Sequence, residues 1–125
     1  MGDFTGIYTE EERNKKIKAE HTRLKKSCKE LDDDKKVLLE NLFHEAAFMA
    51  ITLEETKKII IRDGVIDTYQ NGATQKGLKK AAAVEVYDKM TNTYLKVLDQ
   101  INKALPEGKK IDPAEAILQY VTGAK

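Results

Sequence analysis

The chain has 125 residues and a net charge of +1, with 34% charged residues, 6% aromatic residues and no tryptophan. That length suits one domain with a modest core and is too short for two ordinary domains. Because aromatic residues are sparse and charged residues abundant, the composition argues against a large β architecture and favours helices. We therefore expect an all-α fold in a single helical domain over residues 1–125.

The charges are segregated along the chain. Residues 13–29 contain eight basic side chains and one acid, whereas residues 1–12 contain four acids and no base. The only cysteine, Cys28, cannot form an intramolecular disulfide, and the first residues lack the basic and then apolar order of a secretory signal. The longest apolar run, residues 46–51, is far shorter than the roughly 20 residues that span a bilayer. We expect a protein of a reducing cytoplasm, with no membrane partner.

A basic helix is predicted over residues 9–31. Thr9 and Glu12 have the spacing of a capping box at its start. Its apolar positions recur three and four residues apart, and five lysines fall on the arc opposite that stripe. Such a face would attract phosphate backbone, although the alternative is an ordinary solvated helix face. The candidate DNA-binding residues are Lys15, Lys16, Lys18, Arg23, Lys25, Lys26 and Lys29.

A long antiparallel helical hairpin is predicted over residues 33–105, with a connector at residues 64–81. The acids at residues 32–34 suit a helix start, and Gly64 suits the position after a helix end. The second arm runs from about Ala82 to Leu105. In the connector, Asn71-Gly72 between short extended stretches indicates either a small β-ribbon or a compact loop at the hairpin tip.

The remaining residues, 106–125, form a C-terminal segment with one short helix. Asp112 and Pro113 have the character of an N-cap and a first helical residue, and the helix is expected from Ala114 to about Val121.

The first arm of the hairpin is apolar nearly all round at residues 46–51. One partner helix cannot cover such a surface, so we expect a homo-oligomer. Copies of the same chain would then bury the rest. The candidate interface residues are Phe43, Ala47, Phe48, Met49, Ile51, Tyr87, Met90 and Tyr94.

The residue inventory argues against an enzyme. The two histidines, His21 and His44, are each expected to be structural, and no nucleophilic triad or zinc-ligand spacing is present. Residues 72–79 have the glycine spacing of a phosphate-binding loop, but leucine stands where that loop needs its lysine. Glu54 and Glu55 are interpreted as part of a solvated face. We expect no catalytic residues, metal or cofactor.

The order of several short motifs resembles the small terminase subunits of tailed phages and prophages of Gram-positive bacteria. The motifs are AFMAITLEE at residues 47–55, YQNG at 69–72 followed by QKG at 75–77, YDKM at 87–90, and a helix ending in LP at 105–106. The resemblance covers roughly residues 37–106. Many small terminases have an N-terminal helix-turn-helix, whereas this chain offers one basic helix before the hairpin.

The resemblance implies a ring-forming homo-oligomer that recognises double-stranded phage DNA and regulates the large terminase subunit in the cytoplasm of the bacterial host. The large subunit would supply the packaging ATPase and the nuclease, so this chain would be a non-catalytic component. The alternative is a structural helical adaptor that binds protein only.

Overall fold

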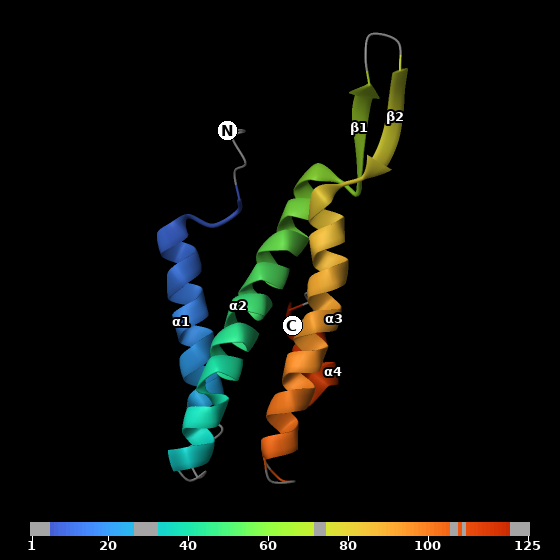
Figure 1. The fold of residues 1–125 in the computed structure, drawn as a ribbon. Coiled ribbons are helices and arrows are strands. Elements are labelled where there is room, and N and C mark those ends of the chain that lie inside the picture. Colours follow the sequence, from blue (N-terminus) through green and yellow to red (C-terminus); the bar gives the residue numbers. More distant parts are fainter. Residues whose placement is uncertain (1–5, 27–32, 72–74, 106–107, 109, 121–125) are drawn as a thin grey trace.

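The computed structural model describes residues 6–26, 33–71, 75–105, 108 and 110–120. It confirms the all-α class, with one short β-ribbon added (Figure 1). The elements in chain order are α1 (Glu10–Lys26), α2 (Asp33–Asp63), β1 (Ile66–Asn71), β2 (Gln75–Lys80), α3 (Ala82–Ala104) and α4 (Pro113–Tyr120). Among the described residues, no helix combines the length and apolar composition that crossing a bilayer requires.

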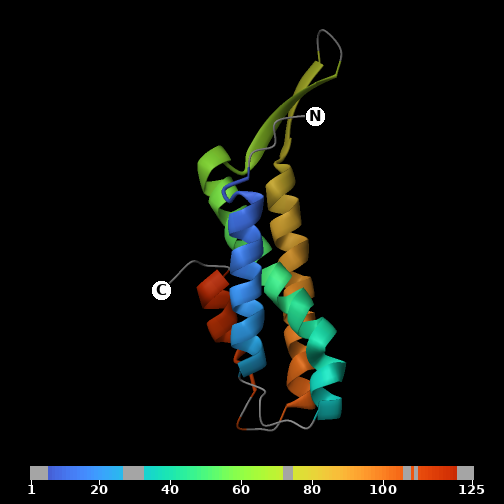
Figure 2. The same ribbon diagram turned by 90° about the vertical axis from the view of Figure 1, so that its left-hand side faces the viewer.

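The longest helix, α2, lies between α1 and α3 and crosses them obliquely (Figure 1, Figure 2). It pairs with α3 as the predicted hairpin, while α1 packs along another side and α4 also contacts it. The core combines Leu39, Phe43 and Leu53 of α2 with Leu98 and Ile101 of α3, all of which are fully buried. Leu39 and Phe43 are four positions apart and Leu98 and Ile101 are three apart, as expected on a buried helix face.

The predicted oligomer interface needs correction. Phe43, Ala47, Met49, Ile51 and Tyr94 are buried inside one protomer, so they are not available to a second copy. The middle of α2 is apolar nearly all round because several helices of the same chain share it. Of the other candidates, Tyr87 and Met90 pack partly against the core and Phe48 is exposed.

The connector is a β-ribbon, which settles the alternative that the sequence left open. β1 and β2 pair antiparallel from Ile66 opposite Lys80 to Asn71 opposite Gln75, and the ribbon projects beyond the helices (Figure 1). Gly64 ends α2 with a φ of 89°, a left-handed conformation that favours glycine, and its N–H donates to the carbonyl of Ile60 at 2.7 Å. Gly72 of the predicted turn lies outside the described residues.

A pair of hydrogen bonds places the segment that leads into α4. The Asn102 side chain of α3 donates to the carbonyl of Ile111 and accepts from its N–H, both at 2.7 Å. The Asp112 carboxylate then accepts from the N–H of Ala114 at 2.9 Å, and Pro113 is the first residue of α4 as predicted. Asn102 thereby holds the returning chain against α3.

Candidate nucleic-acid interface

The position of α1 depends on a buried carboxylate of α2. Glu55 accepts hydrogen bonds from the backbone N–H groups of Ile7 and Tyr8, at 2.8 and 2.9 Å, and from Nε and Nη2 of Arg13, at 2.7 and 2.8 Å. Hydrogen bonding to Arg13 holds the pKa of Glu55 below its ordinary value. Glu55 is only 6% exposed, so its interpretation as part of a solvated face was wrong. The N-terminal segment covers it.

The same junction is closely packed around Tyr8. Its hydroxyl donates to Glu54 at 2.5 Å, and burial together with this bond raises the pKa of Tyr8. The ammonium groups of Lys16 and Lys58 lie 4.9 and 5.3 Å from the ring centroid, within the range of a cation–π interaction. The start of α1 is therefore fixed to α2 by charged, aromatic and backbone contacts together.

The residues at the start of α1 form its N-terminal cap. The N–H of Thr9 donates to the Glu12 carboxylate at 2.9 Å, and the N–H of Glu12 donates to the Thr9 hydroxyl at 3.0 Å. This reciprocal pair confirms the predicted capping box. Further along, Leu24 is buried and Ile17 packs against the core, which turns the lysines of the opposite arc to solvent.

The candidate DNA-binding residues fall into three groups. Lys15, Lys18 and Lys26 are exposed and form no ion pair with a described residue. Lys16, Arg23 and Lys25 each have a carboxylate within reach: Lys16 lies 3.6 Å from Glu54, Arg23 2.5 Å from Glu20, and Lys25 3.7 Å from Glu40. Lys29 lies outside the described residues. The structure therefore leaves part of the predicted set open to a phosphate.

A hollow of about 410 Å³ lies between α1 and α2 where several of these lysines meet. It is lined by Lys18, His21, Thr22, Lys25, Lys26, Lys36, Glu40 and Phe43. Lys36 comes from the first turns of α2, and sequence reasoning missed it because nothing local shows that this turn faces the end of α1. Four lysines against one glutamate make the hollow basic, and buried Phe43 is part of its lining.

Two histidines meet beside this hollow, one from each helix. The rings of His21 and His44 are stacked, with centroids 3.8 Å apart and planes inclined by 14°. Nε2 of His21 and Nε2 of His44 lie 3.2 and 3.3 Å from the same oxygen, Oε2 of Glu40. Burial, with the neighbouring His44, lowers the pKa of His21. The two histidines lie far apart in the sequence, so no local pattern predicts that they meet.

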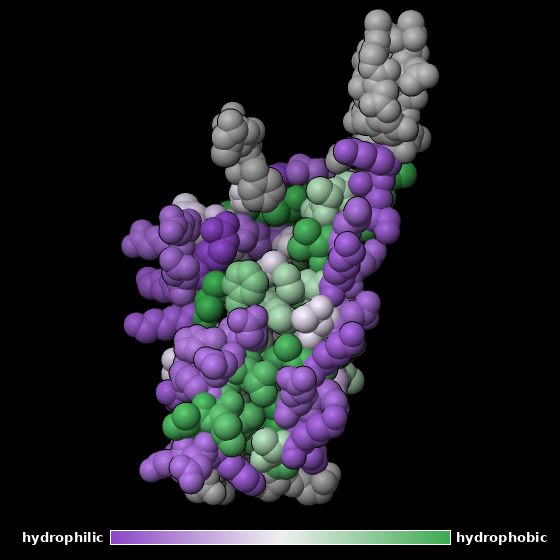
Figure 3. All heavy atoms as spheres, viewed as in Figure 1, coloured by the Kyte–Doolittle hydropathy of each residue, from purple (hydrophilic) through white to green (hydrophobic). Residues whose placement is uncertain are grey.

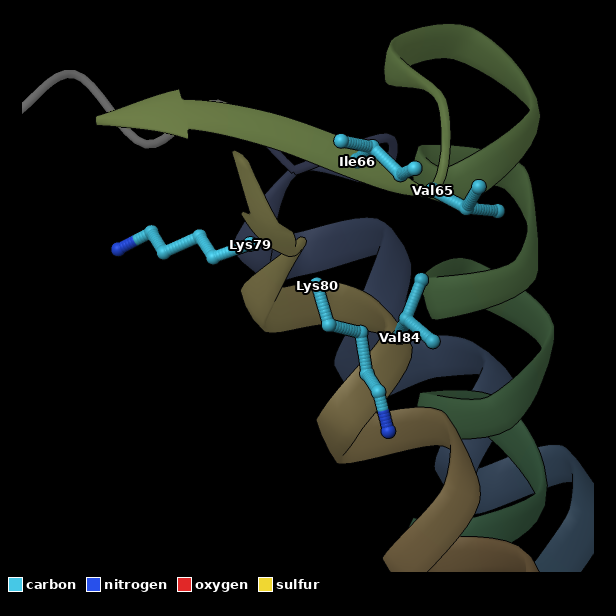
Figure 4. Close-up of a pocket in the computed structure, with 5 residues that line it drawn as sticks. All are labelled: Val65, Ile66, Lys79, Lys80 and Val84. Carbon is cyan, nitrogen blue, oxygen red and sulfur yellow. The ribbon is translucent and has the colours of Figure 1, made fainter. Parts of the chain in front are cut away.

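A second hollow, of about 390 Å³, lies at the base of the ribbon (Figure 4). Val65 and Ile66 line it from the ribbon side and Val84 from α3, while Lys79 points away from these apolar side chains. Lys80 extends along α3, where its Nζ lies 3.5 Å from a carboxylate oxygen of Asp88. Apolar side chains dominate this hollow, which suits a protein contact better than a phosphate.

An exposed apolar face follows α2. In the space-filling view, hydrophobic side chains form a band over α2, with hydrophilic side chains at both edges (Figure 3). Exposed apolar residues on α2 include Val37, Leu38 and Phe48. A contiguous apolar surface of this kind is typical of a protein contact.

Searches against known protein families, curated proteins and solved structures find no match for this chain.

Proposed function

We propose that the chain is a DNA-binding, non-catalytic component of phage genome packaging, equivalent to the small terminase subunit and acting in the cytoplasm of the bacterial host. The observation that supports DNA binding is the meeting of Lys18, Lys25 and Lys26 of α1 with Lys36 of α2 at one open hollow. Lys15, on the same arc of α1, extends this basic surface toward the N-terminal end of the helix. Clustered lysines on one surface attract phosphate groups and displace counterions.

The mode of binding follows from the kinds of side chain at this surface. Lysine ammonium groups contact phosphates as point charges, and α1 has no Phe, Tyr or Trp on which unstacked bases could stack. Binding is therefore directed mainly to the backbone of a duplex, with strong salt dependence and weak sequence selectivity. In this role the protein would position DNA for the large terminase subunit, whose ATPase and nuclease do the chemistry.

The test compares two triple variants with the same change of charge. Lys18, Lys26 and Lys36→Gln removes lysines of the hollow, whereas Lys89, Lys96 and Lys103→Gln removes exposed lysines of α3. Affinity for a duplex of phage DNA is measured by fluorescence anisotropy over a range of salt concentrations. Each lost phosphate contact reduces the slope of log affinity against log salt by about 0.9. The hollow variant should lose affinity and slope, and the α3 variant should keep both.

Other outcomes of this titration have distinct meanings. An equal loss in both variants would show that net charge alone is responsible, and a hollow variant that keeps its affinity and slope would refute this site. A native protein without DNA affinity at low salt would refute the proposed function. Reconstitution with the large subunit, with ATPase measured in the presence and absence of this protein, tests the packaging role itself.

Self-association is the second part of the proposal, supported by the exposed apolar face of α2. Because Phe48 is 46% exposed, Phe48→Glu should disrupt an oligomer while leaving the protomer folded. Met49 is buried in the core, so Met49→Lys should instead destabilise the protomer and serves as the contrast. Light scattering gives the mass in solution, and circular dichroism reports folding. An unchanged mass for Phe48→Glu would exclude this face as the interface.

A structural adaptor that binds protein only is the alternative, and the same apolar face favours it. An adaptor needs neither DNA affinity nor a closed ring. The anisotropy and mass measurements together therefore separate the two functions.

A further inference from the structure

Three side chains able to ligate a metal ion meet where α1 lies against α2. Glu40 and His44 are four residues apart and therefore share one face of α2, and His21 approaches from α1. One ligand atom from each residue can be chosen so that all three lie within 4.8 Å of one another. Two imidazoles and one carboxylate are a donor set found in zinc sites that keep a fourth position for water.

Two of the three donor-to-donor distances in this cluster match the edges of a zinc tetrahedron. With bonds of about 2.0–2.2 Å, neighbouring donors in such a site are about 3.3–3.5 Å apart. The two nitrogen-to-oxygen distances at Oε2 of Glu40 are 3.2 and 3.3 Å. The imidazoles are stacked, so they must splay for both lone pairs to point at one ion. The His44 side chain is 57% exposed and has room to turn, whereas that of His21 is largely enclosed.

The state of His21 also suits a ligand. Its Nε2 is buried and, although near Glu40, makes no hydrogen bond of good geometry within the described part of the chain. A buried polar atom without a partner is destabilising, and coordination would satisfy it. Lys25 competes for the same carboxylate, but its Nζ lies 3.7 Å from Oε1, which leaves Oε2 for an ion.

We propose that His21, Glu40 and His44 bind one divalent transition-metal ion of the zinc class, with water as the fourth ligand. The ion connects α1 to α2 and adds positive charge beside the lysine hollow. The imidazole ligands select zinc, cobalt, nickel or copper over magnesium and calcium, which prefer oxygen ligands.

The experiment uses the full chain without a histidine tag, treated with EDTA and dialysed. ZnCl₂ is titrated by calorimetry, CoCl₂ is followed by visible absorption, and MgCl₂ serves as the metal control. We expect one Zn²⁺ per protomer, the absorption of tetrahedral Co²⁺, and no response to Mg²⁺. Loss of a group that only supports a metal ligand lowers metal affinity about 10- to 100-fold. Because Glu40 and His44 are proposed as direct ligands, Glu40→Gln and His44→Gln should each lower the affinity by at least about 10-fold. Glu45→Gln, an exposed neighbour outside the cluster, should bind as the native protein does.

Three results would overturn the proposal. The first is a native protein without saturable Zn²⁺ binding. The second is undiminished binding in both Glu40→Gln and His44→Gln, which are partly exposed positions where the fold should survive. Because Cys28 could supply a thiolate, Cys28→Ser is titrated as well. Retained binding in that variant supports the proposed ligands, whereas lost binding assigns the ion to the thiol and refutes them.

Discussion

Replacing Glu55 with glutamine tests the junction that holds α1 in place. The carboxylate accepts four hydrogen bonds, two from Arg13 and one each from the N–H groups of Ile7 and Tyr8. Glutamine keeps one acceptor oxygen, and its NH₂ group then faces N–H donors. A hydrogen bond to a charged group contributes about 1.5–3 kcal/mol. Glutamine should lose about half of the four bonds, and renewed hydration of Arg13 offsets part of that loss. The unfolding free energy should therefore fall by about 2–4 kcal/mol.

Urea and thermal denaturation followed by circular dichroism measure this change. At roughly 4 °C for each kcal/mol in a domain of this size, the melting temperature should fall by about 8–16 °C. Glu54→Gln is the matched control, because Glu54 is the neighbouring acid but is more exposed, with a side chain that is 28% accessible. Glutamine keeps an acceptor oxygen for the Tyr8 hydroxyl, so the loss of unfolding free energy should stay below about 1 kcal/mol, as for other partly exposed ion pairs.

Acid should reduce the difference in unfolding free energy between Glu55→Gln and the native protein. The pKa of Glu55 in the folded chain is lowered from its ordinary value of 4.5. The unfolded chain therefore takes up the proton first, and the carboxylate stabilises the fold fully above about pH 4.5 and progressively less as the pH falls through the folded pKa. A difference that is the same at pH 3 and pH 7, or no difference at either, would refute the charged junction.

Three further predictions concern the rest of the fold, each measured as unfolding free energy in urea. Asn102→Ala removes both hydrogen bonds to Ile111 and should cost about 1–3 kcal/mol, whereas a neutral result would mean that the returning segment is held elsewhere. Gly64→Ala places a side chain at a φ of 89° and should cost about 1–2 kcal/mol, and a gain in stability would contradict that backbone conformation. Leu98→Ala empties a fully buried position and should cost about 2–5 kcal/mol, so a change below 1 kcal/mol would argue against its burial.

Local patterns in the sequence predicted the helices well. The spacing of Thr9 and Glu12, the glycine at position 64 and the proline at position 113 each act within a few residues, and each marks a helix end in the structure. The second arm of the hairpin was predicted from about Ala82 to Leu105, and α3 extends over Ala82–Ala104. These features depend on neighbours in the chain, which is why sequence alone could identify them.

Contacts between distant segments could not be predicted in the same way. Glu55 and Arg13 are 42 residues apart, and no local pattern shows that the N-terminal segment will cover this acid. The same limit applies to Lys36 at the hollow and to the stacking of His21 on His44. The apolar middle of α2 indicated burial correctly, but periodicity cannot show whether the covering helices belong to the same chain or to another copy.

The separation of Arg13 from Glu55 also bears on the order of events during synthesis. The capping box of α1 joins residues only three apart, so this helix can begin to form as soon as it leaves the ribosome. The carboxylate that anchors Arg13 lies 42 residues further along the chain and is synthesised later. During that interval the lysines of α1 are exposed on a helix without its tertiary partner, and isolated helices of this length are marginally stable in water. The nascent chain therefore exposes its basic segment before the rest of the helical bundle has folded.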